Sequence, residues 1–380
     1  MRTRYAIPVA ATALAACVVA PAADAHPAHG LTARFLGESV VPHALDYQGT
    51  TVGGLSGIDR DPRTGQYVIL CDDRSALQPA RLYTASIPVD EHGVGPVTFT
   101  STHPLRRADG TTYPPVSATE GTIDPEDVRV DPWTGNYTWS QEGQRTVAPG
   151  KAPVLVQPSV GVVRRDGSYV RTLPLPADER ITAADRGPQD NFSLEGLTYA
   201  AGGALVVSEV EGPLLQDAPN ATTEHGTLSR MTVQTRRGAV LAQYVYPQEP
   251  LFANPVPPTA FSVTGVSAVL AVDPLDPTRY LMMERGYAVG VGYRIQIFEV
   301  DTRGATNVKD YDSVAGEDVT PVRKRLVADL ADYPLSTVDN VEGMAWGPRL
   351  RTGERTLVLV SDDNFAADEV TQVIALAVRG

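Results

Sequence analysis

The sequence predicts an all-β protein, a β-propeller in which five blades are favoured and six stay possible. Three observations carry this prediction. One motif recurs five times at an even spacing, short β-branched segments alternate with turn residues, and helix signals are nearly absent. Four short antiparallel strands in each repeat would make one propeller blade.

Each repeat begins with a strand, passes through a turn and enters a second strand that ends in polar or acidic residues. Near the start of the first strand every copy has a Ser or a Glu, which we call the marker residue: Ser56, Glu126, Glu195, Ser267 and Glu342. Successive markers lie 70, 69, 72 and 75 residues apart. Turns such as Asp61-Pro62 and Asp131-Pro132 separate the two strands, as such pairs commonly do. Unrelated loops would not recur so evenly, so these are tandem units.

Two further strands are expected in each of the first four units. They span residues 81–88 and 97–103, 160–165 and 169–175, 227–234 and 241–246, and 293–300 and 324–330. The fifth unit offers only three strands, at 342–346, 356–361 and 371–378. We expect residues 31–41 to supply its fourth strand, which closes the ring and removes two exposed sheet edges. A sixth blade stays possible if the loop at 247–259 hides further strands.

The first 25 residues have the layout of a secretory signal peptide. Arg2 and Arg4 precede an apolar run at residues 6–20, and Ala23-Asp24-Ala25 is a small-x-small cleavage pattern. We therefore expect an exported bacterial protein, secreted or extracytoplasmic, with residues 26–380 as a single propeller domain. A lipoprotein box ending at Cys17 is the minor alternative. Past the signal, no stretch is apolar enough to span a bilayer.

Charge and cysteine content narrow the function classes. The formal net charge is -13, which disfavours nucleic acid and anionic membranes as partners and suits cation binding. Signal removal leaves Cys71 as the sole cysteine, so an intramolecular disulfide is excluded and a buried structural thiol is expected. We expect a monomer that acts on a small-molecule ester.

Acidic residues are expected to gather at one mouth of the channel. In a hairpin, the start of the first strand and the end of the second lie at the same end, and both positions are rich in acids here. Crowded carboxylates raise each other's pKa unless a cation joins them, and oxygen ligands in such number suit Ca²⁺ better than Zn²⁺. The candidate metal ligands are Glu126, Glu195, Glu342, Asp73 and Asp362. For any one of them, accepting backbone N–H groups is an equal alternative.

Four further residues are candidates for catalysis and substrate binding. Arg74 and Arg285 follow second strands and can bind the phosphate or carboxylate of a substrate, or pair with a neighbouring acid. Glu142 and Glu284 are candidate general bases. Ser56 does not sit in a Gly-x-Ser-x-Gly elbow, so a serine nucleophile is not indicated.

Several of these segments resemble the phytase-like family described as having esterase-like activity. The resemblance lies in Gly-Leu-Ser-Gly-Ile at 54–58, Leu-Glu-Gly-Leu at 194–197, Asn-Val-Glu-Gly-Met-Ala at 340–345 and Val-Ser-Asp-Asp-Asn-Phe at 360–365. It implies a secreted or periplasmic propeller, loosely similar to calcium-dependent alkaline phytases and to propeller lactonases. Ser267, where a Glu is expected, and Cys71, before the first acidic pair, depart from the pattern.

Two functions from different classes follow. One is an exported, metal-assisted hydrolase of phosphate or carboxylate esters. The other is a non-catalytic propeller that uses the same mouth to bind an extracellular or cell-wall ligand, because a fold alone does not decide activity.

Overall fold

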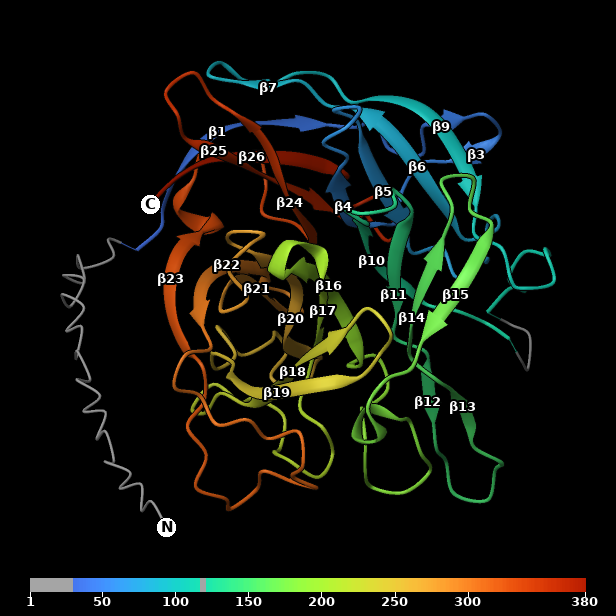
Figure 1. The fold of residues 1–380 in the computed structure, drawn as a ribbon, viewed down its shortest axis with the longest axis vertical. Coiled ribbons are helices and arrows are strands. Elements are labelled where there is room, and N and C mark those ends of the chain that lie inside the picture. The colour runs from blue at the N-terminus through green and yellow to red at the C-terminus, as the bar shows by residue number, and fades with distance from the viewer. Residues whose placement is uncertain (1–29, 117–120) are drawn as a thin grey trace, which may run out of the picture.

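The computed structural model describes residues 30–116 and 121–380, and in them the chain is a five-bladed β-propeller (Figure 1). Five four-stranded antiparallel sheets stand around a central channel, and each first strand contacts the first strands of both neighbouring blades. The all-β prediction and the favoured blade count are confirmed. The expected signal peptide, residues 1–25 with Cys17, lies outside the described residues.

The blades follow the sequence repeats in order. Blade 1 consists of β4 (Leu55–Arg60), β5 (Tyr67–Cys71), β6 (Arg81–Ser86) and β9 (Thr98–Pro104). Blade 2 consists of β10 (Pro125–Val130), β11 (Tyr137–Gln141), β14 (Ser159–Val163) and β15 (Tyr169–Leu173). Blade 3 consists of β16 (Leu194–Ala200), β17 (Leu205–Val210), β18 (Leu228–Thr235) and β19 (Val240–Pro247). Blade 4 consists of β20 (Ser262–Ala271), β21 (Arg279–Ala288), β22 (Gly292–Asp301) and β23 (Arg323–Asp329).

Blade 5 combines both ends of the described chain. It consists of β24 (Val341–Arg349), β25 (Arg355–Ser361), β26 (Gln372–Arg379) and β1 (Thr32–Val40). β1 runs antiparallel to β26, from Thr32 opposite Arg379 to Val40 opposite Gln372, and the two strands lie side by side in Figure 1. Ring closure by the N-terminal strand is therefore confirmed. No strand is assigned between β19 and β20, so the described residues leave no sixth blade in that loop.

Short hairpins and helical turns lie in the loops between the blade strands. Three hairpins lie outside the blades: β2 (Asp46–Tyr47) with β3 (Thr50–Thr51), β7 (Val89–Asp90) with β8 (Gly93–Val94), and β12 (Gln144–Thr146) with β13 (Val154–Val156). The helical turns in the described residues are η1 (Ala177–Glu179), η2 (Ala201–Gly203) and η3 (Leu330–Asp332).

The core lies between neighbouring blades rather than at the channel. Apolar clusters fill all five blade–blade interfaces, because each twisted sheet packs its two faces against the sheets beside it. Cys71 is fully buried between blades 5 and 1, and burial raises the pKa of its thiol far above the ordinary value. The structure therefore confirms that this thiol is buried in the core.

One buried arginine holds the first strands together. Arg129 of β10 is 2% exposed and donates to the carbonyls of Ile58 at 2.5 Å, Leu197 at 2.6 Å and Val269 at 3.2 Å. Its Nη2 also pairs with Asp127 at 2.8 Å. One guanidinium thus joins blades 1, 2, 3 and 4 across the channel, because a planar fork of five N–H donors can reach several carbonyls at once.

Candidate functional site: the acidic mouth of the channel

A β-bulge at the marker residue opens every blade toward the channel mouth. The register between first and second strand shifts at the same place in all five blades: between Leu55 and Gly57, Pro125 and Val128, Leu194 and Leu197, Val266 and Ala268, and Val341 and Gly343. A bulge re-aims the side chain that it carries. The repeated bulge therefore sets all five markers in equivalent places.

The register also identifies the matching position on each second strand. The residue before the marker pairs with Cys71, Gln141, Val210, Glu284 and Ser361, in blade order. Side chains alternate along a strand, so the next residue faces the mouth. These next residues are Asp72, Glu142, Glu211, Arg285 and Asp362. We call them the partner residues; four are acids, and blade 4 has an arginine.

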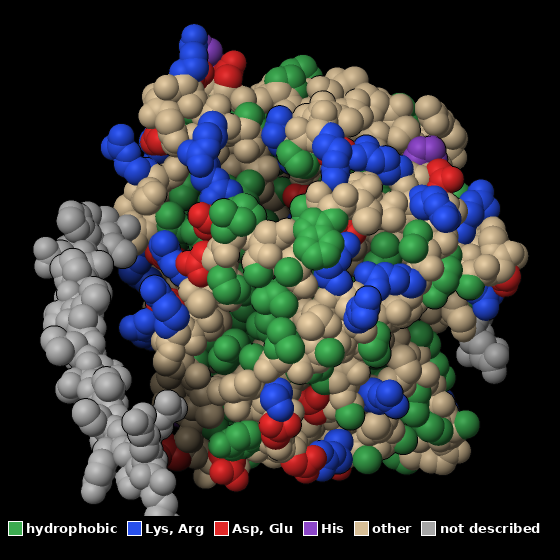
Figure 2. All heavy atoms as spheres, viewed as in Figure 1, with side chains coloured by type: hydrophobic (Ala, Val, Ile, Leu, Met, Phe, Trp, Pro, Cys, Tyr) green, Lys and Arg blue, Asp and Glu red, His purple; other side chains and the backbone are tan. Residues whose placement is uncertain are grey.

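These side chains line one cavity of about 480 Å³, which we call the acidic pocket. Its carboxylates come from blades 1, 2, 3 and 5: Asp72, Asp124, Glu126, Glu142, Asp190, Glu195, Glu211, Glu342 and Asp362. Arg74 and Arg285 are the basic residues in its lining. On the molecular face drawn in Figure 2, by contrast, Lys and Arg are spread widely and Asp and Glu form no large patch.

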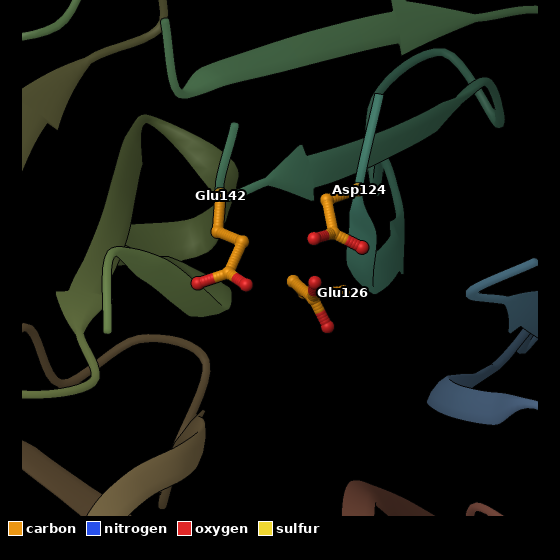
Figure 3. A group of neighbouring side chains, drawn as sticks. All are labelled: Asp124, Glu126 and Glu142. Atoms are coloured by element: carbon orange, nitrogen blue, oxygen red, sulfur yellow. The ribbon is translucent and has the colours of Figure 1, made fainter. Parts of the chain in front are cut away.

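Two groups of three carboxylates are close enough to share an ion. Oxygens of Asp124, Glu126 and Glu142 lie within 4.8 Å of one another, and so do oxygens of Glu142, Glu195 and Glu211. Figure 3 shows the first group converging from the strand β10, the residues just before it and the end of β11. Glu142 belongs to both groups. In the second group, Oε2 of Glu211 is buried and has no hydrogen-bond partner among the described residues.

Burial and mutual repulsion raise the pKa of these acids. Burial is the largest cause for Glu126, and Glu195 and Asp124 raise its pKa further. For Glu195, burial is followed by the charges of Glu211 and Glu142. For Glu142, burial is followed by Asp124 and Glu211. The pocket therefore favours either protonated acids or a bound cation.

The opposite side of the pocket behaves in the same way. Burial raises the pKa of Asp362 well above its ordinary value, followed by the charges of Asp72 and Glu342. Burial also raises the pKa of Asp72, again helped by Glu342. The repulsion therefore extends from blade 2 to blade 5.

Both candidate arginines lie in the pocket. Arg74 pairs with Asp124 at 3.2 Å, and its side chain is 30% exposed. Arg285 pairs with Glu211 at 2.9 Å and Glu342 at 3.3 Å, and it donates to Asn340 Oδ1 at 2.8 Å. Each arginine thus pairs with a pocket acid, which was the alternative, and still faces the cavity.

Two predicted site residues are placed elsewhere. Asp73 accepts N–H groups from the loop at residues 76–78 and pairs with Arg81 at 2.7 Å. Glu284 accepts from Tyr246 Oη at 2.6 Å and pairs with Lys324 at 2.6 Å. Each lies one residue from a partner position, so strand alternation turns its side chain away from the pocket. Asp73 is thus a loop cap, and Glu284 a buried ion-pair member.

The remaining predicted acids, Glu126, Glu142, Glu195, Glu342 and Asp362, all line the pocket. Sequence reasoning did not select Asp72, Asp124 or Glu211, which join them. Aligning the second strands on the marker residue would have found Asp72 and Glu211. The markers Ser56 and Ser267 are buried, and their hydroxyls have no partner within the described parts of the chain.

The fold and this pocket define a five-bladed β-propeller with an acidic channel mouth. The sequence model of the phytase-like family, described as esterase-like activity of phytase, matches residues 50–365. The chain therefore belongs to the phytase-like family. A comparison with curated proteins gives no match. Among the described residues, no helix is long and apolar enough to cross a membrane.

Solved structures show distant likeness in fold. An exo-β-1,3-galactanase from Phanerochaete chrysosporium with galactose is 11% identical, with a TM-score of 0.44, over 89% of this chain and 64% of that chain. A GH43 β-1,3-galactosidase with galactodeoxynojirimycin is 10% identical, with a TM-score of 0.44, over 90% and 94%. A gluconolactonase from Xanthomonas campestris is 12% identical, with a TM-score of 0.32, over 85% and 86%. At these values the likeness carries no functional argument.

Proposed function

We propose that this protein is an exported hydrolase of phosphate or carboxylate esters that works with a divalent cation, Ca²⁺ in the first place, in the acidic pocket. The observation that carries the proposal is the excess of carboxylates over arginines in one cavity, with two groups within ion-sharing distance. Family membership supports ester hydrolysis. Export rests on the signal-like residues 1–25.

The residues present fit a hard cation. All the close-set donors are carboxylate oxygens, which Ca²⁺ prefers, and Glu211 Oε2 lacks a partner among the residues described. We propose Glu126, Glu195, Glu211 and Asp124 as ligands, with Glu142 between the two groups. Glu342 and Asp362, which face the same cavity, extend the ligand set toward blade 5. Asp73 is not part of it.

The chemistry follows from the residues around the cation. A bound divalent cation polarises the ester oxygen and lowers the pKa of its water. Arg74 and Arg285 hold the anionic part of the substrate, and the acids that pair with Arg285 fix the position of its guanidinium. Glu142 is the proposed proton acceptor in place of Glu284, through the carboxylate oxygen that the cation leaves free, because Glu142 lies where the two groups meet.

Turnover with and without calcium tests this function. The purified protein is assayed on phytate, a simple phosphomonoester and a short acyl ester, first in chelator and then with calcium restored. We expect calcium-dependent hydrolysis of at least one ester, and Ser56→Ala is expected to keep substantial activity. Loss of turnover in Ser56→Ala, with Glu195→Gln still active, would replace the proposal with a serine esterase. Calcium binding without turnover of any ester would favour the binding propeller.

A further inference from the structure

Blade 4 departs from the other blades at the acidic pocket. At the partner position the other four blades have a carboxylate, and blade 4 has Arg285. At the marker position it has Ser267. Blade 4, with the residue that leads into it, therefore contributes no carboxylate to the lining of the pocket as described. Its contribution is Phe261, Val263, Arg285, Tyr287 and Tyr293.

Three of these side chains form a row of rings, which we call the aromatic wall. The ring centroids of Phe261 and Tyr287 are 6.4 Å apart, and those of Tyr287 and Tyr293 are 4.6 Å apart. Phe261 is 59% exposed. A single exposed aromatic side chain is ordinary on a protein surface. A continuous row along one side of a polar cavity differs from such a scattered side chain, because it gathers apolar area in one place beside polar groups.

Neighbouring blades fix the base of the wall. The Tyr293 hydroxyl donates to Glu369 Oε1 at 3.0 Å, and Glu369 in turn accepts from Asn364 at 2.8 Å. Arg285, next to the rings in the pocket lining, is held between Glu211 of blade 3 and Glu342 of blade 5. The Tyr293 ring and the Arg285 guanidinium are already held in place, so they lose little conformational freedom when a ligand binds.

The wall and the carboxylate groups occupy different parts of the pocket. Both close-set groups come from blades 2 and 3, and the rings come from blade 4 and the residue before it. A ligand that spans the two would place an anionic group beside the cation proposed at the acids, and a flat apolar group at the rings. Arg285, held between blade 3 and blade 5, is a fixed positive charge next to that anionic group.

We propose that the aromatic wall binds the ring of an aryl-bearing organic anion, whose phosphate or carboxylate end reaches Arg285 and the acidic pocket. This names the substrate class of the proposed function and rests on it. The inferred substrate is an ester that carries an aromatic ring close to its anionic or reacting group. Offset or edge-on ring packing contributes beyond the area that it buries.

Two stable phosphonates test the wall without turnover. Phenylphosphonate and methylphosphonate carry the same head group and differ in the ring, so calorimetric titration of each in calcium measures the contribution of the ring. We expect phenylphosphonate to bind roughly 10-fold more tightly to the wild-type protein. Phe261→Ala and Tyr287→Ala should each lower that preference several-fold and leave the affinity for methylphosphonate unchanged.

Trp133→Ala is the matched control. Trp133 is also 59% exposed, but it follows the turn residue Asp131 at the other end of the blades, so its loss should leave the phenyl preference intact. Three results would contradict the proposed aryl-binding role of the aromatic wall. They are equal affinities for the two phosphonates, no measurable binding of either, and an unchanged phenyl preference in Phe261→Ala and Tyr287→Ala. The proposed function fails separately, by absence of ester turnover, and a persisting phenyl preference would then leave the wall as a binding site alone.

Discussion

The two ends of the blades carry buried acids in opposite arrangements. At the turn end, Asp61 between β4 and β5 pairs with Arg165 of the next blade, and Asp131 between β10 and β11 pairs with Arg236 of the blade after it. At the mouth, nine carboxylates share a pocket with two arginines. The same residue type therefore joins blades at one end and repels its neighbours at the other.

The pKa shifts record this difference. Burial alone would raise the pKa of Asp61 and Asp131, but hydrogen bonds and ion pairs, chiefly with Arg63, Arg165, Arg236 and Thr134, hold both below the ordinary value. Burial raises the pKa of Asp124 to about 6 and that of Glu211 to about 7. Acids at the turn end thus stabilise the ring, and acids at the mouth cost stability until a ligand binds, a trade that functional sites commonly make.

The largest expected effect is on turnover at the mouth. Glu195→Gln removes a proposed ligand of the cation, so activity should fall by at least ~100-fold. It also removes a carboxylate that Glu211 and Glu142 repel. The melting temperature in chelator should rise, because the repulsion is relieved. Steady-state kinetics and thermal melts in chelator check both effects. Lower stability together with full activity would place Glu195 in a structural role like that of Asp131.

Calcium should stabilise the mouth. A ligand that binds only the native state at ~100 times its Kd adds roughly 2.7 kcal/mol. Chelator should therefore lower the melting temperature of the purified protein, and calcium should restore it. Magnesium at the same concentration is the comparison, since it keeps its own waters more firmly. An identical melting curve in chelator and in calcium would mean that the repulsion at the mouth is relieved by protons alone.

A substitution at the turn end should have the opposite effect, on stability and not on turnover. Asp131 is 2% exposed and accepts from Trp133 N at 2.9 Å and Thr134 Oγ1 at 2.7 Å, besides pairing with Arg236. Asp131→Asn should cost about 1–3 kcal/mol of unfolding free energy and leave turnover unchanged. Urea denaturation and kinetics measure the two. An unchanged free energy of unfolding in Asp131→Asn would contradict the claim that acids at the turn end stabilise the ring.

The smallest expected effect is the pH dependence of the metal-free protein. The folded state holds protons on Asp124 and Glu211 up to pH values of about 6 and 7, and the unfolded chain releases them near the ordinary values of 3.8 and 4.5. Stability in chelator should therefore fall as the pH rises through this window. Calcium displaces these protons, so the fall should be smaller in its presence. Melts at pH 5 and pH 7.5 measure the difference, and a rise in chelator would have the wrong sign.

The repeat made the fold predictable. Marker spacing favoured five blades over six, and the strand shortage in the last unit identified the residues that became β1, because a closed ring leaves no exposed edge. The direction in which individual side chains point was harder to predict. Asp73 and Glu284 differ by one residue from Asp72 and Arg285, and in a strand one residue exchanges the two faces. The registers set by the bulges distinguish the two faces.

The sequence pattern did not predict which side chains from distant segments meet in the pocket. Asp124 lies before β10 and meets Glu142 only through the hairpin geometry of blade 2. The aromatic wall joins Phe261, from the loop before β20, with Tyr287 and Tyr293 of the following hairpin. Such contacts depend on loop paths that repeat spacing does not specify.

Calcium binding to the chelator-treated protein tests the central claim most directly. Isothermal titration of the wild-type protein should show binding, and elemental analysis should find the cation retained after desalting. Glu142→Gln, which removes the acid shared by both carboxylate groups, should weaken binding strongly, and Asp131→Asn should bind as the wild type does. No heat of binding and no retained metal in the wild-type protein would contradict the claim that the mouth is a cation site.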